Sequence, residues 1–228
     1  MGRTAKRDRG SEIMIVYTSI TGKKDELLEQ KKYPDVEYVA FLDEDKKSDI
    51  WKIEKTDNQI EDPYLRAKYY KILPHKCLKT DVSLWIDGNI RLKIDPTELF
   101  KHLADSDIVL FKHNLRQCSY MEAVVVASLG YEHYDKVEKQ MVRYKKEGFP
   151  VNYGLTYNGF ILRKHTPQVE DLCEFWWKEI VNNSRRDQLS FMYSCWKLGI
   201  KPKIVPIGDV HHENEVYERV LHNYESKI

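Results

Sequence analysis

The fold is decided by the stretch Asp81-Val-Ser-Leu-Trp-Ile-Asp87-Gly88-Asn89. Its short apolar run predicts a buried strand, and Gly88 marks the end of that strand. In an open α/β sheet, ligands bind outside the carboxyl ends of the strands, which is where Asp87 and Asn89 would lie. A carboxylate and a carboxamide at this spacing suit a hard divalent cation that also contacts phosphate oxygens. The same residues would also form an ordinary polar turn, so this stretch alone leaves both interpretations open.

The composition is that of a globular protein. The 228 residues are enough for one domain with a substantial core. Charged residues make up 32% of the chain and nearly cancel to +1, which excludes a bulk electrostatic preference for nucleic acid or membrane. Four widely spaced cysteines, without a C-x-x-C pair, favour reduced thiols in the cytoplasm.

The first residues are basic and lack the apolar segment of a signal peptide, and no later run has the length of a membrane span. We therefore expect a disordered basic leader at 1–11 and a single domain at 12–228, in a cytoplasmic setting.

Strands and helices alternate along the chain. Apolar, β-branched runs predict strands at 13–18, 36–42, 82–86, 107–111 and 203–207. Helices are expected at 62–74, from 95, at 131–147, from 166 and at 187–198, and three of them begin with a capping residue followed by proline or a capping box. Such alternation predicts an α/β fold with a mainly parallel sheet and helices on both faces.

Polar residues follow each of the first strands and precede the Asp87 strand. The loop after the first strand offers hydroxyls and backbone N–H groups to a nucleotide, and a carboxylate ends the second strand. Three cations on the helix before the Asp87 strand, Arg66, Lys68 and Lys71, are either a solvated helix face or ligands of a diphosphate. The predicted donor-binding residues in this half of the chain are Thr18, Ser19, Thr21, Asp43, Arg66, Lys68, Asp87 and Gly88.

The second half of the chain adds three candidate segments. Asn158 and Gly159 bring a small, flexible backbone to an apolar strand, where a sugar of the donor would approach closely. The segment 184–188 opens a helix, so its polar residues could simply be N-caps. Alternatively, they face the sugar of the donor, and Arg186 or its neighbour Arg185 lies beside a phosphate or the acceptor. His211, in an adjacent histidine pair, is a candidate third ligand for a Mn²⁺-like metal.

The chain resembles the glycosyltransferase-like family formerly called domain of unknown function 616, which includes plant mucilage-related and ceramidase-labelled proteins and bacterial and viral relatives. The resemblance spans roughly residues 14 to 200. It rests on the strings Arg66-Ala-Lys-Tyr-Tyr-Lys-Ile-Leu-Pro-His75, Leu84-Trp-Ile-Asp-Gly-Asn89, Lys112-His113 with Arg116-Gln-Cys-Ser-Tyr-Met-Glu122, and Ser184-Arg-Arg-Asp-Gln188. More remotely, the chain is similar to retaining enzymes of GT-A type, whose metal motif is Asp-x-Asp where this chain has Asn89.

The resemblance implies a GT-A-like fold and the transfer of a sugar from a nucleotide sugar to a hydroxyl acceptor. We expect the nucleotide sugar to be a UDP-sugar. Mn²⁺ or Mg²⁺ on Asp87, Asn89 and His211 would neutralise the leaving diphosphate, as a Lewis acid does. Asp187, Gln188 and Arg186 would be catalytic, and a second group would line the pocket: His113, Arg116 and Glu122. Retention is expected, which needs no general base, whereas inversion would need Asp187 or Glu122 as the base.

Three other functions remain open on the sequence. A metal-dependent hydrolase of phosphate esters or amides would use the same predicted metal ligands without an acceptor. A non-catalytic nucleotide-sugar-binding module would keep the donor site alone. The third alternative is a glycosyltransferase whose acceptor is a nucleic-acid base. The sequence does not distinguish this acceptor from a glycan or a lipid.

Overall fold

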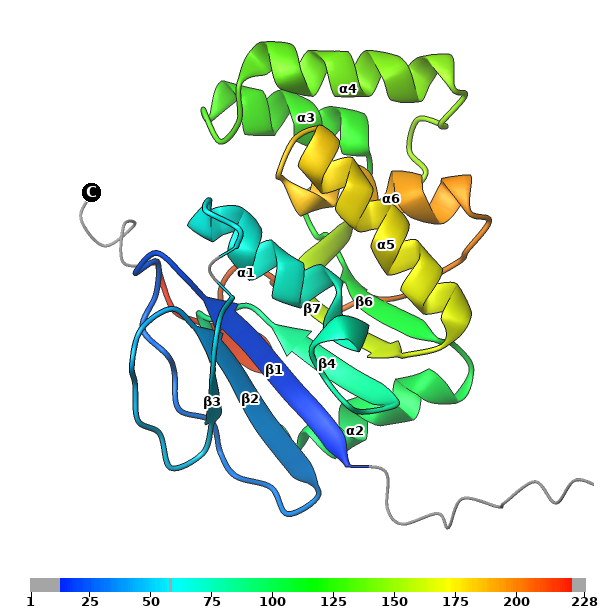
Figure 1. Cartoon of the computed structure of the whole chain (residues 1–228). Helices are drawn as coiled ribbons and strands as arrows, with labels where there is room; N and C mark the ends of the chain where they lie inside the picture. Colours follow the sequence, from blue (N-terminus) through cyan, green and yellow to red (C-terminus); the bar gives the residue numbers. More distant parts are fainter. Residues whose placement is uncertain (1–12, 58, 223–228) are drawn as a thin grey trace, which may run out of the picture.

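The computed structural model describes residues 13–57 and 59–222, and its centre is a seven-stranded sheet (Figure 1). The strand order is β3-β2-β1-β4-β7-β6-β8. The bounds are β1 Met14–Ile20, β2 Val36–Leu42, β3 Lys52–Lys55, β4 Val82–Ile86, β6 Ile108–Lys112, β7 Thr156–Lys164 and β8 Lys203–Val205. A separate two-stranded ribbon pairs β5 (Ile90–Leu92) with β9 (Tyr217–Arg219).

The sheet is mixed, and β7 is the strand that reverses its direction. β1 runs parallel to β2 and β4, β2 to β3, and β6 to β8, whereas β7 is antiparallel to both β4 and β6. The predicted α/β fold with a mainly parallel sheet is therefore confirmed. Because β7 is reversed, its amino end meets the carboxyl end of β4, and Phe160 pairs with Ile86 at that point.

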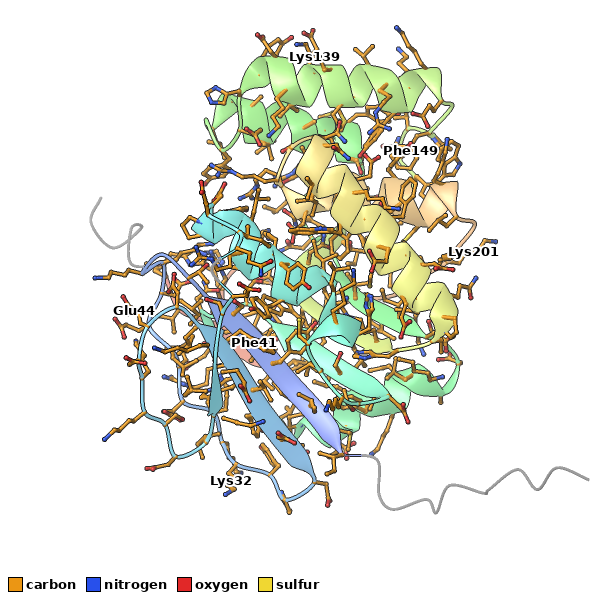
Figure 2. The ribbon with its side chains drawn as sticks, in the orientation of Figure 1. Lys32, Phe41, Glu44, Lys139, Phe149 and Lys201 are labelled. Atoms are coloured by element: carbon orange, nitrogen blue, oxygen red, sulfur yellow. The ribbon has the colours of Figure 1, made fainter. Side chains whose placement is uncertain are left out.

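Both faces of the sheet are buried, which explains the nearly continuous apolar strands. One face of β1 and β4 carries Tyr17 and Trp85 into a core with the helices, and the alternate residues Val16 and Leu84 enter a second core on the opposite face. Figure 2 shows the side chains filling the space between the layers, with Phe149 turned in among the helices and Lys139 on the outer side of α4.

Most helices cover a single face of the sheet. The long helices are α1 (Pro63–Ile72), α3 (Ser119–Ser128), α4 (Tyr134–Lys146), α5 (Pro167–Asn182) and α6 (Asp187–Lys197), and Figure 1 shows all five on the same side. The opposite face has α2 (Pro96–Phe100), a short 3-10 helix (Lys101–Ala104), the β5–β9 ribbon and the segment around 27–33. A second 3-10 turn, Pro74–Lys76, follows α1.

Local sequence sets the start of α1 as predicted. The Asp62 carboxylate accepts hydrogen bonds from the backbone N–H groups of Tyr64 (2.8 Å) and Leu65 (3.4 Å), and Pro63 takes the first helical position. This start directs the helix so that Lys68 and Lys71 face the end of β4.

Four elements escaped prediction from the sequence: β3, β5, α3 and β9. Three of them are strands of three or four residues, too short for a periodicity signal, and α3 is apolar on almost every side. The predicted leader at 1–11 lies outside the described residues. None of the described helices has the length and apolar character needed to cross a membrane.

Candidate functional site

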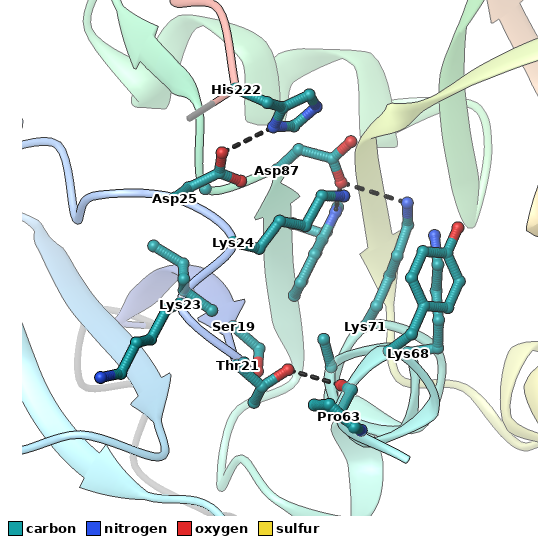
Figure 3. A pocket seen from close by; sticks show the side chains of 16 residues that line it. Ser19, Thr21, Lys23, Lys24, Asp25, Pro63, Lys68, Lys71, Asp87 and His222 are labelled. Carbon is teal, nitrogen blue, oxygen red and sulfur yellow. Dashed lines mark hydrogen bonds and ion pairs between the residues drawn. The ribbon is translucent and has the colours of Figure 1, made fainter. Parts of the chain in front are cut away.

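Two adjoining cavities open at the carboxyl ends of β1 and β4. The first cavity, about 450 Å³, lies between the loop after β1, the start of α1 and the end of β4 (Figure 3). The second cavity, about 280 Å³, lies between the start of β7, the start of α6, the end of α3 and the segment around 211–222. The residues that line both cavities are Lys24, Tyr64, Lys68, Lys71, Asp87 and His222.

Asp87 lies at the junction of the two cavities. Its backbone N–H donates to the carbonyl of Gly159 (2.9 Å), which fixes the end of β4 against β7. Its Oδ1 accepts hydrogen bonds from the Trp85 indole N–H (2.8 Å) and from Lys71 (3.2 Å). At the next residue, a Cβ on Gly88 would lie only 2.6 Å from Ile20 Cγ1, so the turn needs glycine.

A buried charge network joins the two sides of the junction. Asp187, at the start of α6, accepts from Lys71 (2.6 Å) and from Lys68 (2.8 Å), and Lys71 also reaches Asp87. Burial by itself would raise the pKa of Asp87, but the ammonium groups of Lys71 and Lys68 outweigh it and lower that pKa to about 2. The same two lysines overcome burial at Asp187 and lower its pKa as well. Both carboxylates are therefore ionised at neutral pH.

The wall of the second cavity contains an uncharged histidine and a closed ion pair. His113 Nδ1 accepts hydrogen bonds from the backbone N–H groups of Leu115 (3.3 Å) and Arg116 (3.1 Å), so the proton of the neutral ring belongs on Nε2. Burial, helped by the Arg116 charge, lowers the pKa of His113 to about 4. Arg116 itself is paired with the buried Glu122.

The structure brings most of the predicted residues together. Those that line a cavity are Ser19, Thr21, Lys68, Asp87, Gly88, His113, Arg116, Glu122, Asn158, Gly159, Arg186, Asp187, Gln188 and His211. Gly159 has a steric reason to be glycine, because a Cβ there would lie 2.5 Å from the ring of Tyr157. Gln188 donates to the carbonyl of Thr156 (3.3 Å), which ties the start of α6 to β7.

Three predicted donor-binding residues line neither cavity. Thr18 is buried within β1. Asp43 accepts from the backbone N–H of Gly22 (2.8 Å) and lies 3.5 Å from Arg66, whose guanidinium also donates to the carbonyl of Ile60 (2.8 Å). Asp43 and Arg66 therefore brace the loop behind the first cavity.

Of the three predicted metal ligands, Asp87 and His211 line the second cavity, whereas Asn89 lines neither cavity. Asn89 lies outside both cavities, where its amide donates to the carbonyl of Val220 (2.7 Å) and its buried Oδ1 has no protein partner among the described residues. His211 packs against the ring of His113 in the second cavity, 5.1 Å between centroids. It is His222 that contacts Asn89, with Nε2 at 3.5 Å from the amide nitrogen.

His222 is oriented as metal-binding histidines commonly are. Its Nδ1 lies 2.6 Å from the Asp25 carboxylate, and a carboxylate on the second ring nitrogen holds a histidine ligand in place. Asp87, Asn89 and His222 together offer a carboxylate, an unpartnered amide oxygen and an imidazole, a donor set that suits Mn²⁺. Within the described ranges, no three His, Cys, Asp or Glu side chains are grouped closely enough to hold a metal by themselves.

Sequence reasoning missed several residues in or beside the junction: Lys24, Asp25, Tyr64 and His222. Lys71 belongs, with Arg66 and Lys68, to the cations predicted near a diphosphate. His222 is more than 130 positions from Asn89 and had no local signal.

Comparison with known proteins then identifies the family. Residues 17–222 match the family described as TOD1/MUCI70, glycosyltransferase-like domain. The chain belongs to this family. It is the family formerly called domain of unknown function 616, so the resemblance seen in the motifs is confirmed, as is the expectation of a glycosyltransferase-like enzyme domain.

Among curated proteins, the chain is similar to the probable hexosyltransferase MUCI70 of Arabidopsis thaliana, with 27% identity over 163 residues. The match covers 66% of this chain and 28% of the Arabidopsis protein, so the chain spans well under half of that relative.

Two solved structures of glycosyltransferases also match. The bifunctional glycosyltransferase WbbM matches 83% of this chain and 39% of its own, with 12% identity and a TM-score of 0.47. Mouse xyloside xylosyltransferase 1 matches 84% of this chain and 77% of its own, with 9% identity and a TM-score of 0.37.

Proposed function

We propose that this glycosyltransferase-like domain transfers a hexosyl group from a UDP-sugar to a hydroxyl acceptor, with retention at the anomeric carbon. The observation that carries the proposal is the shared wall of the two cavities. Three lysines, Lys24, Lys68 and Lys71, lie at that wall beside Asp87, between a larger cavity and a smaller one. A nucleotide sugar has the same order of parts: nucleoside, diphosphate, sugar.

The nucleoside is assigned to the first cavity and the sugar to the second. Ser19 and Thr21 line the first cavity with hydroxyl-bearing side chains, beside apolar surface from Ile20 and Pro63. Asn158 and Gln188 line the second cavity with amides, the groups that commonly bind sugar hydroxyls. Asp187, between the lysines and Gln188, is then placed to stabilise positive charge at the anomeric carbon.

The electrostatics favour departure of a diphosphate. The second cavity is lined by six cationic side chains and three carboxylates, an excess of three positive charges. Negative charge grows on the diphosphate oxygen as the bond to the sugar breaks, and preorganised cations stabilise it without reorganisation. Arg186 adds to this field from the N-cap position of α6, with its guanidinium 5.0 Å from the ring of Tyr131.

Retention is supported by the lack of a suitable base among the carboxylates of the second cavity. Asp87 and Asp187 are held by lysines, with lowered pKa values, and Glu122 is paired with Arg116. A carboxylate held in this way is a weak proton acceptor. The acceptor hydroxyl would therefore give its proton to the departing diphosphate while its oxygen bonds to the sugar on the same face.

We further propose that Mn²⁺ or Mg²⁺ takes part. Asp87, Asn89 and His222 would hold the metal, with His222 in the role predicted for His211. The metal would supply Lewis-acid stabilisation of the diphosphate. This chain's own contribution is to hold His222 with Asp25 and to keep Asp87 ionised with Lys71.

Calorimetric titration with UDP, GDP and their hexose conjugates, with and without Mn²⁺, tests the donor assignment. We expect one nucleotide sugar to bind, more tightly with metal, and Asp87→Ala to abolish the metal effect. A wild-type chain that binds no nucleotide under either condition would contradict the transferase and favour the hydrolase. Incubating the bound donor with glycan, lipid and oligonucleotide acceptors then assigns the acceptor, and the anomeric proton coupling of the product reports retention or inversion.

A further inference from the structure

The loop after β1 has an unusual backbone at the mouth of the first cavity. Gly22 (φ +66°) and Lys23 (φ +55°) are consecutive residues in the left-handed region, and Lys23 is one of two non-glycine residues with positive φ in the described chain. A left-handed lysine costs about 1 kcal/mol, so the rest of the structure must enforce this turn.

Two contacts enforce the turn. The backbone N–H of Gly22 donates to Asp43 (2.8 Å), and the Thr21 hydroxyl donates to the carbonyl of Pro63 (2.5 Å). The consequence is visible in Figure 3: both residues belong to the cavity wall, but the Lys24 side chain extends towards Asp87, whereas the Lys23 side chain points away from Asp87. The Lys23 side chain is 85% exposed and lies 3.7 Å from Glu44.

Lys24 differs from the other lysines of the junction in its partners. Lys68 and Lys71 are committed to Asp187 and Asp87. Lys24 lines both cavities, yet over residues 13–57 and 59–222 no carboxylate lies within ion-pair distance of its ammonium group. Its Nζ lies over the ring of Tyr64, 5.5 Å from the centroid.

We infer that Lys24 is the cation that binds the departing diphosphate directly, an inference that rests on the proposed function. The paired lysines hold the carboxylates of the site ionised, and their charge is largely compensated. Among the described residues Lys24 holds no ion pair, so its ammonium can bind an incoming diphosphate without an existing ion pair being broken.

In the transfer step, the bond from the anomeric carbon to the diphosphate oxygen breaks and its electron pair stays on that oxygen. Lys24 donates a hydrogen bond to the diphosphate and keeps its proton. The acceptor oxygen bonds to the anomeric carbon, and the acceptor's proton passes to the diphosphate. The strained turn at Gly22 and Lys23 is then the device that aims Lys24.

The test compares Lys24→Met with Lys23→Met, its matched control in the same loop. Each chain is titrated with UDP and with uridine, which lacks the phosphates. We expect Lys24→Met to weaken UDP binding about tenfold or more and to leave uridine binding unchanged, since a charge-assisted hydrogen bond contributes on the order of that factor. Lys23→Met should bind both ligands as the wild type does, and Lys24→Arg should recover most of the lost affinity.

The outcomes separate this inference from the proposed function. If the wild type binds UDP and Lys24→Met binds it equally well, the inference is wrong and the proposed function stands. If Lys24→Met loses uridine and UDP affinity in the same proportion, Lys24 only shapes the cavity and the inference is again wrong. If the wild type binds neither ligand nor any other nucleotide, the proposed function fails and takes the inference with it.

Discussion

The two ends of helix α6 carry charge networks of similar composition and different design. The site network, at its start, consists of Lys68, Lys71, Asp87 and Asp187. The helix network, at its other end, consists of Arg143, Tyr144, Glu147, Glu179, Tyr193 and Lys197, from α4, α5 and α6.

The helix network is closed, whereas the site network is open to the cavities. Glu179 accepts from Arg143, from the Tyr144 hydroxyl (2.7 Å) and from Asn183 (3.2 Å), and none of these residues lines the first or second cavity. Asp87, by contrast, lines both cavities. A closed network serves packing between helices, and an open one keeps charge available for a ligand. Variants in the two networks should therefore affect different properties.

The largest effect is expected for Asp187→Asn. Removing this carboxylate takes away the charge assigned to the anomeric carbon and leaves Lys68 without its ion-pair partner. We expect the rate of sugar transfer to fall by about 10³-fold. Initial rates with saturating donor measure this, and a loss smaller than tenfold would remove Asp187 from the catalytic role.

Glu179→Gln should give the next largest effect, and on a different property. The variant removes the charge that Arg143 and Tyr144 contact, in a nearly buried position. We expect the free energy of unfolding to fall by about 2 kcal/mol while the transfer rate stays within twofold of wild type. Urea denaturation and initial rates measure the two effects. A large loss of rate in a folded Glu179→Gln chain would show that the two networks are coupled along α6.

Acid should weaken the site network in a defined pH window. The folded-state pKa of Asp87 is about 2, below its ordinary value of 3.8, so its carboxylate adds stability that is complete above about pH 4 and is lost between pH 4 and 2. Without metal, binding of the nucleotide sugar, whose diphosphate has no group that titrates between pH 8 and 5, should be constant over that range and decline below pH 4. His113, with a pKa of about 4, stays neutral over that plateau. Urea denaturation at pH 7 and pH 3 measures how much unfolding free energy each chain loses on acidification. Asp87→Asn should lose less than the wild type, and an equal loss would show that the Asp87 carboxylate does not contribute this stability.

The smallest effect is expected for Lys197→Met in the helix network. Lys197 is 41% exposed, and its partner Glu147 keeps hydrogen bonds from Tyr193 (2.6 Å) and Arg143 (3.1 Å). An exposed ion pair contributes less than about 1 kcal/mol, so both stability and transfer rate should change little. Thermal unfolding and initial rates check this, and a clear loss of rate would extend the functional region to the far end of α6.

Local chemistry made the segments around the two cavities predictable. An apolar run followed by Asp87-Gly88 predicts a strand that ends in a polar turn, and the structure ends β4 at Ile86. The pairing of Asp62 with Pro63 predicts a helix start, and α1 begins there. Because strand ends and helix starts gather at one edge of an α/β sheet, placing these elements correctly placed most of the site as well.

What the sequence did not show is which way a side chain points and what it pairs with. Asp43 and Asp87 both follow strands of the same sheet, yet Asp43 closes a loop with Gly22 while Asp87 reaches the junction. Asn89, two residues beyond Asp87, turns out of both cavities towards Val220. Neither direction is encoded in a short motif, since each depends on a partner distant in the chain.

The sequence by itself determined the strand and helix order, the family and most of the residues that line the cavities, because these follow from periodicity, capping and local motifs. The tertiary structure decided the ion pairs and the histidine beside Asn89. Antiparallel pairing of β5 with β9 carries His222 to Asn89. The packing of α1 against β1 and α5, with the start of α6 beside it, gives Lys68 and Lys71 their carboxylates, and within the described part of the chain it gives Lys24 no ion pair. Charge pairing acts over a few ångströms in space, so it depends on contacts that chain spacing does not specify.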